Sequence, residues 1–149
     1  MPTKKGPDGD LLVLVDVGKH TFGADEIVAF GRQFDPQPYH ADPAAAKNSP
    51  FGGLIASGWH VCAAGMRMLT ERILGQAHTL GSPGIENVRW LKPVRAGDTL
   101  AYRVIVAEAR PSASKPGLGL VKHRWEARNQ DGELALTLEG WILVRRRKS

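Results

Sequence analysis

The sequence predicts an α+β domain in which an antiparallel β-sheet wraps around one long central helix. Two observations favour this class. Residues 54–74 form a single long apolar segment in which charge appears only near the end, so a helix there must be covered on most of its sides. The second half of the chain alternates apolar and polar residues over several segments that are separated by short turns. Strands that follow one another through short turns form antiparallel sheets.

The predicted strands are rich in β-branched residues or show period-two alternation. In the segment around His123, for example, Val121, Trp125 and Ala127 share one face with the histidine. Gly18 is a predicted bulge or turn, and residues 129–132 form a predicted hairpin turn. The expected strands are 11–22, 84–94, 99–109, 120–129 and 133–144.

The helices have recognisable start and stop signals. Residues 24–32 form a predicted short helix with Asp25 and Glu26 in its first turn, where acidic side chains suit the helix dipole. Asp42 and Pro43 are typical of an N-cap followed by the first helical position. The long helix over 54–74 is expected to end at Gly75, a residue type common at the C′ position.

Composition sets outer limits on the function. The 149 residues suffice for one domain, predicted over 10–149 after a loose tail at 1–9. No apolar segment reaches the length of a membrane span or has the form of a signal peptide. The single Cys62 excludes an internal disulfide, which is typical of the reducing cytoplasm. The net charge of +5 favours anionic ligands such as phosphates.

An acid and an imidazole stand five positions apart in a rigid segment. Pro36 and Pro38 push the residues before them, Asp35 and Gln37, toward extended conformations, so the segment is predicted to be an ordered loop. Asp35 and His40 are therefore the candidate catalytic residues, because a carboxylate and an imidazole can together orient and deprotonate a water molecule.

The residues from Asp35 to Pro43, with Ala46, Gly53 to Gly58 and the later segment 84–98, resemble the signature of the MaoC-like dehydratases. This hot-dog-fold group includes the (R)-specific enoyl-CoA hydratases. The resemblance extends from the first helix to the last strand. It implies a hot-dog fold that forms a homodimer or a higher homo-oligomer, with the active site near the subunit interface, and a role in fatty acid metabolism.

The resemblance also assigns roles to residues. Asp35 and His40 match the acid and the histidine of the family pattern Asp-x-Asn-Pro-x-His, whereas Gln37 stands in place of its asparagine. Gly58 matches the glycine at the start of the family's central helix, where its N–H would face a thioester carbonyl. Ser57 and Gly53 are grouped with Gly58 as oxyanion or substrate-binding candidates. Ser57 lacks the neighbours of a hydrolase nucleophile and is interpreted as a helix cap or substrate-lining residue.

The implied reaction is the addition of water to a trans-2-enoyl thioester, or its removal from a 3-hydroxyacyl thioester. The thioester would be carried by coenzyme A or by an acyl carrier protein, and the reaction requires no metal or redox cofactor. Two alternatives remain open, namely a thioesterase and a non-catalytic acyl-CoA binding module. Hydrolysis would release free CoA, whereas hydration leaves the thioester intact.

The basic residues suggest a second set of contacts. A terminal run of four cations is usually a solvated tail, but with two cations of the loop near 111–119 it could meet the phosphates of coenzyme A. These residues are Arg110, Lys115, Arg145, Arg146, Arg147 and Lys148. The sequence carries no recognised nucleic-acid-binding motif. A metal set of His40, Asp42 and His60 is disfavoured because it lacks tight ligand spacing.

Overall fold

A six-stranded antiparallel sheet forms one layer of the protein. The computed structural model describes residues 3–5 and 11–146. The strand order is β1-β2-β4-β5-β6-β3, so consecutive strands β4, β5 and β6 lie side by side and β3 forms an edge. The strands are β1 (Thr3–Lys5), β2 (Leu11–Thr21), β3 (Gly84–Trp90), β4 (Thr99–Pro111), β5 (Leu118–Arg128) and β6 (Leu134–Arg145).

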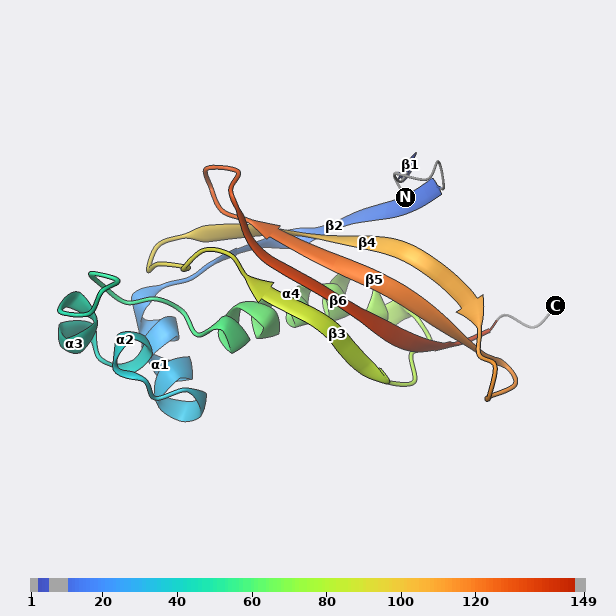
Figure 1. Ribbon diagram of the computed structural model, residues 1–149, viewed down its shortest axis with the longest axis horizontal. Helices are drawn as coiled ribbons and strands as arrows, with labels where there is room; N and C mark the ends of the chain where they lie inside the picture. Colours follow the sequence, from blue (N-terminus) through green and yellow to red (C-terminus); the bar gives the residue numbers. More distant parts are fainter. Residues whose placement is uncertain (1–2, 6–10, 147–149) are drawn as a thin grey trace.

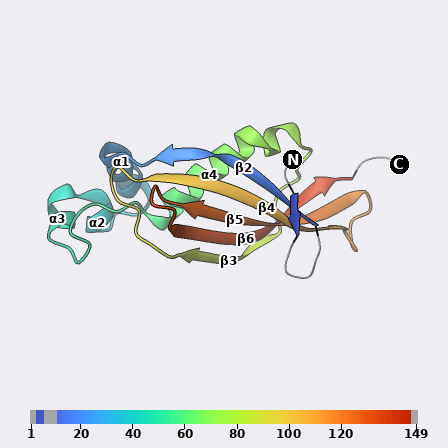
Figure 2. The same ribbon diagram turned by 90° about the horizontal axis from the view of Figure 1, so that it is seen from above.

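Four α-helices and one short 3₁₀ helix are the remaining elements within residues 3–5 and 11–146. They are α1 (Ala24–Phe34), α2 (Pro38–Ala41), α3 (Pro43–Lys47), α4 (Gly58–Arg72) and η1 (Leu74–Gln76). The three shorter α-helices gather at one end of the sheet, whereas α4 runs along the sheet (Figures 1 and 2). The α+β class and the sheet around one long helix are therefore confirmed.

The core lies where α4 meets the inner face of β4 and β5. The alternation predicted in β4 and β5 buries Tyr102, Trp125 and Ala127 on this face. A Cβ at Gly65 of α4 would lie 2.8 Å from the Tyr102 ring, so the absence of a side chain lets the helix approach the sheet closely. The Tyr102 hydroxyl donates a hydrogen bond of 2.7 Å to the Val61 carbonyl, which satisfies its polar end within the core.

Several local predictions are confirmed. The register between β2 and β4 shifts between Asp16 and Gly18, where the bulge was expected. The Asp42 side chain accepts from the backbone N–H groups of Ala44 and Ala45 and so caps α3. Thr3–Lys5, in the expected N-terminal tail, pair with β2, and residues 1–2 and 6–9 lie outside the described residues.

Several local predictions are wrong; the strand expected over 84–94, for example, ends at Trp90. The long helix begins at Gly58 rather than residue 54, because Ile55 forms a β-bridge with Arg95 and the Ala56 N–H donates to the Val94 carbonyl. These long-range hydrogen bonds hold residues 54–57 extended. Gly75 lies within η1 rather than at a C′ position. His40 lies on the one-turn helix α2, which starts at Pro38, and not in a loop.

One side of α4 remains uncovered in the single chain. Trp59 and Met66 of this helix are 60% and 44% exposed, and Ile85 on the neighbouring edge strand β3 is 51% exposed. The expectation that the helix is covered on most sides is therefore not met within one chain. Among the described residues, no helix is both long and apolar enough to span a membrane.

Candidate active site

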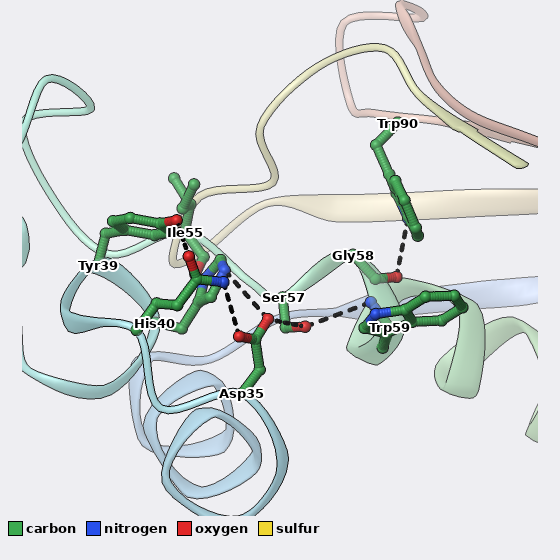
Figure 3. Close-up of polar contacts among 9 residues, drawn as sticks. Asp35, Tyr39, His40, Ile55, Ser57, Gly58, Trp59 and Trp90 are labelled. Atoms are coloured by element: carbon green, nitrogen blue, oxygen red, sulfur yellow. Dashed lines mark hydrogen bonds and ion pairs between the residues drawn. The ribbon is translucent and has the colours of Figure 1, made fainter.

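Asp35 lies directly after α1 and is held by two side chains. Its backbone has left the helical region, with φ −151° and ψ 71°, as expected for a residue before proline. The Gln37 amide donates to Asp35 Oδ1 at 2.7 Å, and the Ser57 hydroxyl donates to Asp35 Oδ2 at 2.7 Å (Figure 3). The Tyr39 hydroxyl in turn donates to Gln37 Oε1. Both carboxylate oxygens therefore have a fixed donor.

His40 is buried, and one of its ring nitrogens is committed to the backbone. Its Nδ1 lies 2.7 Å from the Ile55 carbonyl oxygen. A carbonyl can only accept, so Nδ1 carries a proton, and Nε2 is the ring nitrogen left to take up or release one. The backbone of His40 packs closely on Gly31 of α1, where a Cβ would lie 2.3 Å from the His40 carbonyl oxygen. The sequence alone showed neither contact.

The acid and the imidazole face one another. His40 Nε2 lies 3.4 Å from Asp35 Oδ2, with only 7% and 19% of the two side chains exposed (Figure 3). Burial raises the pKa of Asp35, but the hydrogen bonds from Gln37 and Ser57 and the nearby charge of His40 outweigh it and lower the pKa below its ordinary value. Asp35 is therefore an ionised carboxylate at neutral pH.

A cavity of about 390 Å³ joins this pair to the N-terminus of α4. Asp35, His40 and Gly58 all line it, together with Trp59 and Trp90. Ser57 is the N-cap of α4, since its Oγ accepts from the Trp59 N–H at 3.3 Å. The predicted helix-cap role of Ser57 is thus confirmed. The Gly58 N–H has no acceptor among the described residues, and it belongs to the end of a helix that favours negative charge.

Trp90, which the sequence analysis did not single out, covers this helix end. Its indole N–H donates to the Gly58 carbonyl at 2.9 Å, and a Cβ at Gly58 would lie 2.4 Å from the ring. Only glycine therefore fits under the indole. The sequence placed Trp90 inside the predicted strand 84–94 and carried no local signal of this contact.

The other predicted site residues lie elsewhere. Gly53 is in the turn before Leu54 and does not line the cavity. The four described cations, Arg110, Lys115, Arg145 and Arg146, lie at or beyond the C-terminal ends of β4 and β6. These strand ends are opposite the end where α1–α3 gather (Figure 1), roughly 35–40 Å along β4 from Thr99. Arg147 and Lys148 lie outside the described residues.

Comparison with known proteins identifies the family. The family model of the MaoC like domain matches residues 14–124. The chain belongs to the MaoC-like dehydratase family. A MaoC-like dehydratase from Rhodospirillum rubrum shares 37% identity and superposes with a TM-score of 0.81, with 92% of this chain and 93% of that chain covered. The predicted hot-dog fold is confirmed by these matches.

Two further relatives have hydratase descriptions. The (R)-hydratase from A. caviae, involved in PHA biosynthesis, is 25% identical, with a TM-score of 0.62 over 88% of this chain and 92% of that one. Mesaconyl-CoA hydratase from Cereibacter sphaeroides is 39% identical over 64 residues, which are 43% of this chain and 18% of that protein. Membership of this family supports a hydratase-type activity.

Proposed function

We propose that the protein adds water to a trans-2-enoyl thioester, or removes it from a 3-hydroxyacyl thioester, through Asp35 and His40. The observation that carries this proposal is the 3.4 Å approach of Asp35 Oδ2 to His40 Nε2 in the wall of a cavity that also contains the start of α4. An ionised carboxylate and a neutral imidazole nitrogen are both acceptors. A water molecule can therefore bind there by donating one hydrogen bond to each of the two groups.

The roles of the two groups follow from their protonation. A carboxylate whose pKa is lowered is a weak base, so we assign proton removal to His40 Nε2. The imidazolium that forms lies beside Asp35, which stabilises its charge. The water oxygen bonds to the β-carbon, the double-bond electrons move toward the thioester carbonyl, and the proton returns from the pair to the α-carbon.

The negative charge that develops on the thioester oxygen requires donors. The N–H of Gly58 is free of protein acceptors in the described part of the chain, and Gly58 lines the same cavity as Asp35 and His40. We assign it to the oxyanion, because an unpaired donor at a helix N-terminus combines a hydrogen bond with the positive end of the dipole. The protein contributes three groups to this scheme, namely the side chains of Asp35 and His40 and the backbone N–H of Gly58.

The test is turnover of a panel of trans-2-enoyl-CoA thioesters by the wild type, Asp35→Asn and His40→Ala. Loss of the enoyl absorbance and release of free thiol are followed together. We expect absorbance to fall without thiol release, and each variant to lose a factor of about 100 or more. Thiol release would indicate a thioesterase, whereas ligand binding without any turnover would indicate an acyl-CoA binding module.

We also propose that two copies of the chain associate through the uncovered face of α4 and β3. An apolar groove of about 560 Å³ lies there, lined by Trp59, Met66 and Ile85 among others. The β3 edge offers unpaired backbone groups to a second strand. Sedimentation of the wild type is expected to give a dimer and that of Ile85→Lys a monomer. A monomeric wild type would refute this assembly.

Binding of the coenzyme A phosphates by Arg110, Lys115, Arg145 and Arg146 stays a proposal. Within their own chain these residues lie far from the cavity, so they would serve the cavity of a second subunit. Arg110 already packs its guanidinium over the Trp141 ring at 5.0 Å. Unchanged affinity for coenzyme A after neutralising the four residues would refute the role.

A further inference from the structure

Three side chains of metal-ligating type meet where β2, α1 and α4 come together. His20 lies near the end of β2, Glu26 in the first turn of α1 and His60 in the first turn of α4. One ligand atom from each lies within 4.8 Å of the others. The carboxylate joins the two rings, since Glu26 Oε1 is 2.8 Å from His20 Nε2 and Glu26 Oε2 is 3.8 Å from His60 Nε2. The sequence analysis did not predict this group.

His60 has no partner that explains its burial. Its exposure is only 6%, and its Nδ1 makes no hydrogen bond to the described part of the protein. The contact of 3.8 Å from Nε2 to Glu26 is longer than a hydrogen bond. His60 Nε2 and the Glu26 carboxylate therefore face one another at a distance that an ion bound to both would bridge.

An apolar shell holds both imidazole rings in place. The Phe30 ring stacks on His60 with centroids 4.7 Å apart and an interplanar angle of 8°. The fully buried Phe22 packs edge-on against His60 at 5.0 Å and against His20 at 4.6 Å. Apolar surroundings of this kind orient metal-ligating histidines and limit access of water to the site.

We infer that His20, Glu26 and His60 bind a divalent cation of the zinc class. Two imidazole nitrogens and one carboxylate oxygen form a ligand set typical of zinc sites that keep a fourth, open position. With metal–ligand bonds of about 2.0–2.1 Å, tetrahedral ligand atoms lie about 3.3 Å apart. The three ligand atoms already lie within 4.8 Å of one another, so the separation of each pair needs to change by at most about 1.5 Å.

The cation would join the two helices that carry the proposed catalytic groups. Asp35 follows the end of α1 and lies roughly 14 Å along the helix from Glu26, while Ser57 immediately precedes α4. The metal site is thus distinct from the cavity. His60 Nδ1 has no acceptor in the described residues. A hydrogen-bond acceptor on the second ring nitrogen of a ligating histidine usually raises metal affinity by about 10–100-fold. Because His60 lacks one, we expect a micromolar dissociation constant for zinc rather than a tighter one.

The test is titration of the untagged, full-length protein with Zn²⁺ in competition with a chromophoric chelator. One zinc ion per chain is expected. His20→Ala and Glu26→Gln are each expected to weaken binding by about tenfold or more, because each removes one of three ligands. His78→Ala is the matched control, since this exposed histidine lies outside the cluster, and its zinc affinity should equal that of the wild type.

Co²⁺ gives an independent optical measurement of the same site. Tetrahedral nitrogen and oxygen ligation produces visible absorption bands, which are expected in the wild type and in His78→Ala but absent in His20→Ala. The substituted ligands His20 and Glu26 are partly exposed, so these variants avoid the loss of packing that a change at His60 would cause. No zinc binding, or equal binding by His20→Ala and the wild type, would overturn the proposal.

Discussion

Substitution of Gly31 by alanine tests whether α1 positions His40. Alanine inside a helix normally gains about 1 kcal/mol over glycine. Here the added Cβ would lie 2.3 Å from the His40 carbonyl oxygen and 2.7 Å from the carbonyl carbon. Carbon atoms in contact prefer about 3.5 Å, so the backbone of His40 must move by roughly 1 Å. Overpacking of this kind costs about 1–3 kcal/mol, which outweighs or cancels the gain in propensity.

The larger effect is expected in catalysis. A displacement of about 1 Å in a catalytic group is typically worth about 100-fold in rate, so turnover of the enoyl thioester should fall by that order while the chain still folds. Urea unfolding and the turnover assay measure the two effects separately. Gly23→Ser is the control, because a side chain at Gly23 meets nothing within 4 Å and serine suits its N-cap position. Full activity in Gly31→Ala would refute the positioning of His40 by this contact.

Three further predictions concern the groups around Asp35 and Gly58. Because the pKa of Asp35 is lowered, the stability that its ionisation contributes is complete above its ordinary value of 3.8 and is lost as pH falls from there through the folded-state pKa. Gln37→Leu should raise the pKa of Asp35, followed by NMR titration of its carboxyl carbon, and an unmoved pKa would contradict this. Ser57→Ala removes both the N-cap of α4 and a hydrogen-bond donor to Asp35. The free energy of unfolding in denaturant should therefore fall by about 1 kcal/mol, and kcat should also fall. Wild-type values of both quantities would exclude these roles. Gly58→Ala should displace the Trp90 ring and lower turnover of the enoyl thioester. The double variant Gly58→Ala/Trp90→Leu should recover part of that turnover, because the smaller leucine leaves room for the methyl group. Equal turnover by Gly58→Ala and the wild type would show that the ring moves aside without cost to catalysis.

The sequence predicted the parts of the site that depend on neighbours along the chain. Prolines and a capping aspartate are local signals, so the conformations of Asp35 and Gln37 and the start of α3 were predictable. The start of α4 was not, because its first apolar residues are held extended by hydrogen bonds to Tyr39 and Val94, which lie far away in sequence.

Contacts between distant segments account for the rest. The hydrogen bond from Ser57 to Asp35 joins residues 22 positions apart, and Trp90 reaches Gly58 across 32 positions. The cluster of His20, Glu26 and His60 forms only when β2, α1 and α4 pack together. No spacing rule within one segment indicates such sets, whereas the family resemblance did indicate Gly58.

The pair of Trp59 and Trp90 gives the protein its own optical probe. Their rings meet edge to face with centroids 5.1 Å apart, and both line the cavity beside Asp35 and His40. The chain has four tryptophans, and the other two, Trp125 and Trp141, do not line this cavity. A ligand that enters the cavity replaces water around two of the four indole rings. Tryptophan fluorescence can therefore report how much of the cavity is occupied, without a labelled substrate. Affinity can then be measured for thioesters that the protein holds but does not convert.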